Sequence, residues 1–177
     1  MSEVWVFAYG SLLWRPGFDH VERRRATLDG YRRAFCMASI HYRGTPEAPG
    51  LVLALDHAPG QRCDGVAYRV EPGRVEATLA ALRARELVSY AYDEALLPVR
   101  LDDGREVAAV AYVINREHAQ YRGGLSLDEQ AAIIARAAGG MGPNADYLAN
   151  TAASLAALGI EDAELAELAE LVAARRA

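Results

Sequence analysis

The sequence predicts an α+β fold in which a largely antiparallel, closed or strongly curled sheet is accompanied by helices. Short segments rich in β-branched and aromatic residues, separated by Gly/Pro-rich turns, occupy the first half of the chain. Alanine-rich segments with helical spacing dominate the second half. With 177 residues the chain can build one good-sized core but hardly two, so we expect a single domain, residues 1–177.

About six strands are expected. Their approximate ranges are residues 5–9, 26–37, 51–55, 65–70, 96–101 and 106–114. The last two strands flank Asp102-Asp103-Gly104-Arg105. Asp-Gly indicates a tight hairpin here, because both residues tolerate positive φ.

One helix interrupts the strands and three follow them. Pro72 suits the first turn of a helix that runs to about Leu87. A capping box at residues 126–129 opens the second helix, which Gly139-Gly140 would stop. The third would start at residues 143–144 and end at Gly159. The last is amphipathic, and its apolar face consists of Leu165, Leu168, Leu171 and Val172.

Composition excludes several classes of function. A net charge of −5 argues against capture of nucleic acid, and no apolar run approaches the roughly 18 residues of a membrane span. The N-terminal residues lack the pattern of a secretory signal, so we expect the cytoplasm. Cys36, Cys63 and four scattered histidines show no metal-ligand spacing, so we expect no metal and reduced thiols. A monomer is expected, with the last helix as the alternative dimer face.

Arginines 23–25 and 32–33 form one local basic cluster beside an expected strand. Clusters of this kind are typical of solvated faces, and an anion-binding role is the alternative.

Glu86 is the first candidate functional residue. Val75, Leu79 and Leu82 mark the buried stripe of the helix after Pro72, and Glu86 follows at an offset of 11 from Val75. At 100° per residue this offset places Glu86 within about 20° of the direction of Val75. A desolvated carboxylate with a raised pKa suits a general base near neutral pH. The alternative is that Glu86 reaches water at the helix end, or pairs with Arg83 or Arg85.

The second candidate is the segment Tyr9-Gly10-Ser11-Leu12, which directly follows the first strand. Backbone N–H groups at such a turn can hold a carbonyl oxygen as it becomes an oxyanion. An ordinary strand-ending turn is the alternative. Ser11 does not lie in a Gly-x-Ser-x-Gly elbow, which argues against a hydrolase nucleophile.

Seven segments together resemble the ChaC-like γ-glutamylcyclotransferases, over nearly the whole chain and in the same order. These segments are residues 6–16 (VFAYGSLLWRP), 30–35 (GYRRAF), 43–46 (RGTP) with Pro49-Gly50, 65–69 (GVAYR), Arg85-Glu86, 101–105 (LDDGR) and 142–148 (GPNADYL). The resemblance implies a small mixed β-barrel with flanking helices. It also implies a cofactor-independent enzyme that converts reduced glutathione to 5-oxo-L-proline and L-cysteinylglycine.

The resemblance also implies roles for particular residues. Glu86 falls on the family's catalytic glutamate, and residues 9–12 fall on the loop that cradles the γ-glutamyl group. Tyr147 falls on a tyrosine that lines the pocket, although packing of an aromatic on the barrel is an equal alternative. Arg43 lies in another matching segment, with a structural or a carboxylate-contact role.

Two departures from the family pattern concern the substrate more than the reaction. Tyr42 stands between His41 and Arg43, where the family usually has histidine directly before arginine. Tyr90 stands where a glycine is usual, so its bulk would reshape the leaving-group side of the pocket. The alternatives are therefore ring closure on another γ-glutamyl amine or dipeptide, a non-catalytic anion-binding regulator of ion transport, or an interaction domain that uses the last helix.

Overall fold

The computed structural model describes residues 3–87 and 91–177. Within it the chain forms two compact units. The first consists of residues 1–33 and 55–118, and the second of residues 34–54 and 119–177. Two long strands contribute residues to both units. The single domain expected from the sequence stays a prediction.

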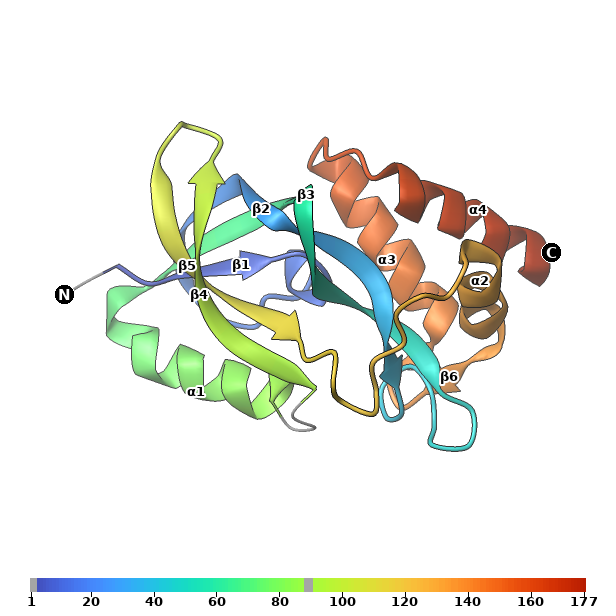
Figure 1. Ribbon diagram of the computed structural model, residues 1–177. Helices are drawn as coiled ribbons and strands as arrows, with labels where there is room; N and C mark the ends of the chain where they lie inside the picture. The colour runs from blue at the N-terminus through green and yellow to red at the C-terminus, as the bar shows by residue number, and fades with distance from the viewer. Residues whose placement is uncertain (1–2, 88–90) are drawn as a thin grey trace. The chain divides into compact units, whose positions relative to one another are not determined.

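A closed barrel of five strands is the main element of the first unit. The strands are β1 (Trp5–Ala8), β2 (His20–Ser39), β3 (Gly50–Val70), β4 (Tyr92–Leu101) and β5 (Glu106–Ile114). Around the barrel they run in the order β1-β3-β2-β4-β5, and β1 pairs with β5 in parallel to close it (Figure 1). The pairs β1–β3, β2–β4 and β4–β5 are antiparallel. The predicted fold class, a mixed and mostly antiparallel barrel with helices, is confirmed.

The predicted number of strands was wrong. The segments expected at residues 51–55 and 65–70 belong to one strand, β3. Pro59 and Gly60 looked like a turn, but Gly60 adopts a φ of +83° inside the strand. Residues 59–62 are exposed to solvent, so the polar side chains of Gln61 and Arg62 stay hydrated while the strand continues. The hairpin between β4 and β5 was predicted correctly, and Gly104 has the expected positive φ of 91°.

Large apolar and aromatic side chains on both faces of the barrel strands are buried. Among the most completely buried are Trp5, Phe7, Tyr68 and Tyr112. All four residues of β1 are buried, which explains why its sequence is a continuous apolar run without alternation. Each fully buried side chain of this size stabilises the fold by about 1.5–3 kcal/mol. The short strand β1 is therefore a firm support for the segment that follows it.

The helix of the first unit consists of a 3₁₀ turn, η2 (Pro72–Arg74), followed by α1 (Val75–Glu86). It lies along the outside of the barrel beside β4 (Figure 1). Arg83 of α1 donates hydrogen bonds to both carboxylate oxygens of Glu94 on β4, with Nε–Oε1 and Nη2–Oε2 distances of 3.0 Å. The predicted helix is confirmed, with its end one residue earlier than expected.

The second unit contains three helices, which are α2 (Leu127–Arg136), α3 (Asn144–Ala157) and α4 (Ala163–Arg176). The capping box at Ser126 is present with both of its hydrogen bonds, as predicted. α2 already ends at Arg136, so Gly139-Gly140 does not stop it. Gly139 instead belongs to a short hairpin of β6 (Ala138–Gly139) and β7 (Gly142–Pro143).

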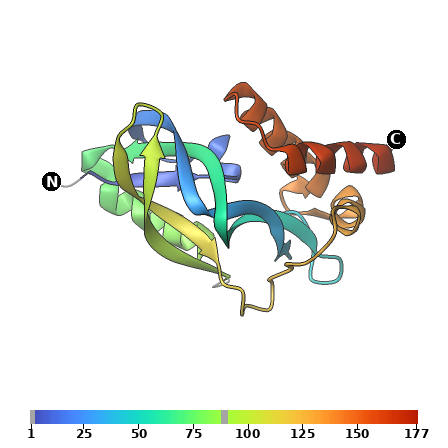
Figure 2. The ribbon, with the colours of Figure 1, turned by 45° about the horizontal axis from the view of Figure 1, so that its top comes forward.

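The bounds of α3 follow the prediction, and α4 presents most of its predicted apolar face to its neighbours. Gly159, with a φ of 70°, directly follows α3 and its C-cap Leu158. α4 packs against α2 and α3 (Figure 2). It buries Leu165, Leu168 and Val172, whereas Leu171 is half-buried. Within the described part of the chain, no helix is long and apolar enough to cross a membrane.

Candidate active site

Glu86 lies on the barrel-facing stripe of α1, as predicted. Thr78 and Leu82 of this stripe are buried, and Val75 and Leu79 are half-buried. The Glu86 side chain, at the last position of the helix, is only 15% exposed. The alternative that Glu86 reaches open water is therefore wrong.

Burial raises the pKa of the Glu86 carboxyl above its usual value, because the charged form loses its hydration. The positive charge of Arg85 acts in the opposite direction and lowers this pKa, but less strongly. The ion pair itself is long, with 3.8 Å between Arg85 Nε and Glu86 Oε1. Glu86 is therefore a largely desolvated carboxylate with a neighbouring cation, which is the state that suits a base working near neutral pH.

The predicted loop begins where β1 ends. Residues Ser11–Leu13 form a 3₁₀ turn, η1, in which the N–H of Leu13 donates to Gly10 O at 2.9 Å. The N–H groups of Ser11 and Leu12 come before the first hydrogen bond of this turn, so the turn itself does not use them. They are candidate donors to an oxyanion. Tyr9 and Leu12 are buried and Ser11 is half-buried.

Arg85 connects this loop with the end of α1. Its Nη2 donates to Ser11 Oγ at 2.9 Å, and its Nη1 donates to Arg15 O at 3.2 Å. The structure thus brings Glu86 and the predicted loop together within one unit. The Ser11 hydroxyl accepts a hydrogen bond from a cation, which lowers its electron density and is the opposite of activation as a nucleophile.

Two buried side chains that the sequence analysis did not single out hold the loop. Tyr68 donates from its hydroxyl toward Leu12 O and Leu13 O, at 3.2 and 3.4 Å. Arg33 donates to Tyr9 O at 2.7 Å and to Asp64 O. Arg33 belongs to the basic cluster for which a solvated face or an anion site was expected, and it has neither role. A signal existed, because neighbouring residues on a strand point to opposite faces, so one of Arg32 and Arg33 had to point inward.

Gly65 is a third feature of this support. A Cβ atom at this position would collide with the carbonyl oxygen of Ala8. Gly65 comes directly before Val66, which pairs with Ala8 at the end of β1. The absence of a side chain therefore allows β3 to approach the point where the chain leaves β1 and enters the loop.

Arg43 and Tyr147 lie together in the second unit. The Arg43 guanidinium carbon is 5.7 Å from the centre of the Tyr147 ring, and its Nη1 donates to Pro143 O at 3.1 Å. The Tyr147 hydroxyl accepts from the N–H of Leu53 at 3.2 Å. Both side chains are buried. These contacts are of the kind expected for the structural role of Arg43 and for the packing alternative of Tyr147, and their roles toward a substrate stay predictions.

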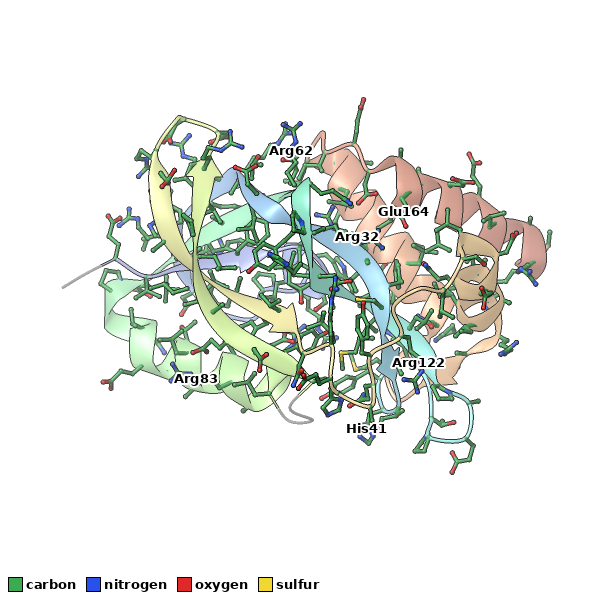
Figure 3. All side chains as sticks on the ribbon, in the orientation of Figure 1. Arg32, His41, Arg62, Arg83, Arg122 and Glu164 are labelled. Carbon is green, nitrogen blue, oxygen red and sulfur yellow. The ribbon has the colours of Figure 1, made fainter. Side chains whose placement is uncertain are left out.

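The two departures from the family pattern have different outcomes. Tyr42 is 53% exposed, and its carbonyl accepts from the N–H of Met141 at 2.9 Å, which ties the loop after β2 to the β6–β7 hairpin. The backbone carbonyl of His41, a residue labelled in Figure 3, likewise accepts a hydrogen bond from the N–H of Gly140 at 2.8 Å. Tyr90 lies outside the described residues. In the ranges 3–87 and 91–177, no group of three or more His, Cys, Asp or Glu side chains could hold a metal ion.

Comparison with known proteins identifies relatives over almost the whole chain. A family model described as ChaC-like protein matches residues 4–175. The chain is 38% identical over 165 residues to the glutathione-specific γ-glutamylcyclotransferase of Escherichia coli, covering 93% of this chain and 71% of the relative. It is 32% identical over 176 residues to human glutathione-specific γ-glutamylcyclotransferase 1, and this match covers 96% of this chain and 78% of the human protein.

A solved structure agrees with these relatives. The crystal structure of the yeast γ-glutamylcyclotransferase specific to glutathione superposes with a TM-score of 0.90 at 26% identity, covering 99% of this chain and 98% of that one. The barrel, the helix that presents Glu86 and the family match therefore lead to the same result. The chain belongs to the ChaC-like family of γ-glutamylcyclotransferases.

Proposed function

We propose that this protein is a glutathione-specific γ-glutamylcyclotransferase, which cleaves reduced glutathione to 5-oxo-L-proline and L-cysteinylglycine. The observation that carries the proposal is the buried Glu86 carboxylate, joined through Arg85 to the loop that offers backbone donors at Ser11 and Leu12. Relatives of this chain in bacteria, humans and yeast are named as enzymes of this specificity.

The reaction is intramolecular. The α-amino nitrogen of the γ-glutamyl group attacks the γ-carbonyl carbon, and this new C–N bond closes a five-membered ring. The tetrahedral intermediate then breaks its bond to the nitrogen of the cysteine residue, which leaves as the amine of Cys-Gly. One proton leaves the attacking nitrogen and one proton reaches the leaving nitrogen, so the step needs no oxidant, reductant or other reactant.

Each candidate residue has a task in this scheme. Glu86 takes the proton of the attacking amine and returns one to the leaving amine, which a carboxyl group with a raised pKa can do in both directions. The N–H groups of Ser11 and Leu12 stabilise the oxyanion, a contribution of about 2.7–4 kcal/mol per donor in well-studied cases. Residues Tyr9, Gly10, Ser11 and Leu12 cradle the γ-glutamyl group.

The setting of the enzyme follows from its chemistry. We place it in the cytoplasm, because Cys36 and Cys63 form no disulfide and the proposed substrate is the reduced form of glutathione. The proposal includes a monomer that acts on a small molecule without nucleic acid, membrane or cofactor.

The decisive experiment is incubation of the purified protein with glutathione, with 5-oxoproline and Cys-Gly measured by mass spectrometry. Glu86→Gln is the test variant, and Glu76→Gln is its matched control, because Glu76 is an exposed glutamate on the first turn of the same helix. We expect Glu86→Gln to lose at least about 100-fold in rate, the usual scale of general acid–base catalysis. Glu76→Gln should keep the wild-type rate. A Glu86→Gln variant that retains more than about a tenth of the wild-type rate would contradict the role of Glu86.

Parallel assays with γ-Glu-Ala and γ-Glu-ε-Lys test the specificity. Turnover of either substrate in preference to glutathione would assign ring closure to a different γ-glutamyl compound. Absence of turnover with all three would instead favour a non-catalytic binding protein.

A further inference from the structure

The guanidinium of Arg85 contacts three groups that belong to two different parts of the proposed site. Its Nε lies 3.8 Å from Glu86 Oε1. Its Nη2 donates to Ser11 Oγ at 2.9 Å and its Nη1 to Arg15 O at 3.2 Å. The partners on η1 are Ser11, at the start of the turn, and Arg15, just after its end. One side chain therefore spans from the carboxylate to both ends of the loop.

We propose that Arg85 is a positioning residue of the proposed reaction, which fixes the carboxylate of Glu86 relative to the backbone donors of η1. The proposal rests on the proposed function. General-base catalysis and oxyanion stabilisation act on two atoms of one small substrate, so the carboxylate and the donors must be held at a set separation. Arg85 contacts the carboxylate of Glu86 and two groups of the segment that carries the donors, Ser11 Oγ and Arg15 O.

The chemistry of arginine fits this task. Its planar guanidinium offers five donors in a fixed fork, so three partners in different directions can be held at once. A lysine at this position would keep the charge but would present a single ammonium on a flexible stem. The two functions of Arg85, charge and geometry, can therefore be separated by substitution.

The charge of Arg85 also has a defined effect on Glu86. Burial and Arg85 act on the Glu86 carboxyl in opposite directions, so loss of the cation would raise its pKa further. Among the described residues, Tyr112 of β5 also senses the Glu86 charge, which raises the Tyr112 pKa, and Tyr112 donates to Glu94 of β4, which pairs with Arg83. Arg83 is fully engaged with Glu94 and is not a cause of the Glu86 shift.

The test compares Arg85→Gln, Arg85→Lys and the matched control Arg83→Gln, which removes a paired arginine two residues earlier on the same helix. Figure 3 shows Arg83 on α1. Two quantities are measured, namely the pH profile of kcat/KM for glutathione and the pH titration of the Glu86 carboxyl by ¹³C NMR. The Glu86 resonance is assigned from its loss in Glu86→Gln.

We expect Arg85→Gln to lower kcat/KM about 10- to 100-fold and to move both the acidic limb of the profile and the NMR midpoint to higher pH. Arg85→Lys should leave the limb near its wild-type position and still lower kcat. Arg83→Gln should change neither the limb nor the midpoint. A residue that served stability alone would lower the melting temperature without moving the limb.

An Arg85→Gln variant with wild-type kcat/KM and an unchanged NMR midpoint would overturn the inference. The NMR titration needs no turnover, so it reports on the coupling even in a poorly active variant, and Arg85→Lys serves if Arg85→Gln does not fold. If the wild type forms no 5-oxoproline, the proposed function fails. If the wild type is active and Arg85→Gln matches it, only the role of Arg85 fails.

Discussion

Replacing Gly65 with alanine tests how closely β1 and β3 must approach below the loop that carries Tyr9. The added Cβ would collide with Ala8 O and lie 3.0 Å from Phe7 Cζ. Carbon and oxygen atoms pack at about 3.5 Å, so the two strands must separate by on the order of 1 Å. The atoms in the way are mainly backbone, and Phe7 is completely buried, so neither can simply rotate aside.

The expected loss of stability has two parts. Overpacking of a filled core costs about 1–3 kcal/mol, and each weakened ladder hydrogen bond between β1 and β3 adds about 1 kcal/mol. A total near 3 kcal/mol would lower the melting temperature of a chain of this size by roughly 6–12 °C. Because the displaced residue Ala8 directly precedes Tyr9, the rate of 5-oxoproline formation should fall as well.

Gly73→Ala is the matched control. Gly73 has no atom within 4 Å of an added Cβ and lies in the turn that leads into α1. Alanine there should stabilise the protein by about 0.4–1 kcal/mol, because it restricts the unfolded chain. Urea unfolding of both variants measures the two effects. A Gly65→Ala variant within about 0.5 kcal/mol of the wild type would refute the argument from close approach.

Three further variants test the supports and the base. Tyr68→Phe should lower the free energy of unfolding in urea by about 1 kcal/mol and lower kcat, because it removes the hydroxyl that donates to the η1 carbonyls. Wild-type stability and kcat in this variant would show that these long hydrogen bonds do not support the loop. Asn144→Ala should cost about 2–4 kcal/mol by thermal unfolding, because the completely buried Asn144 side chain pairs with both Leu51 N and Leu51 O at 2.8 Å. Glu86→Gln should raise the free energy of unfolding at neutral pH. Because the native pKa lies above the unfolded pKa, the native state binds more protons than the unfolded state at pH values between the two. Stability therefore falls as pH rises through that range, by about 1.4 kcal/mol for each pH unit that separates the two pKa values. If the free energy of unfolding has the same pH dependence in the wild type and in Glu86→Gln, the prediction for Glu86 is wrong.

Local patterns in the sequence predicted the local parts of the fold. Helical periodicity was enough to place Glu86 on the buried stripe of α1, since the turns of one helix determine that geometry. The Asp-Gly hairpin and the capping box at Ser126 are likewise complete within four residues. Two local predictions were wrong: a glycine with positive φ at position 60 lets β3 continue through an exposed segment, and α2 ends at Arg136, before Gly139-Gly140.

The supports of the site depend on contacts between distant parts of the chain. Arg33 reaches Tyr9 across 24 residues, Tyr68 reaches Leu12 across 56, and Arg85 reaches Ser11 across 74. No periodicity links such positions, because the closure of the barrel brings them together. A resemblance to a family identified the segments that contain these residues, but not which atoms they join.

The position of Glu86 is costly for the fold, and this cost argues for a function. Its carboxylate is buried, its cation is 3.8 Å away, and it ends a helix, where the partial negative charge of the helix dipole opposes it. A neutral glutamine of nearly the same shape would avoid all three penalties. Proteins keep destabilising groups of this kind mainly where activity needs them. The proposed reaction needs one, because a well-hydrated carboxylate would be too weak a base to take a proton from an amine. The same three features that lower stability therefore make Glu86 the strongest candidate for the catalytic residue.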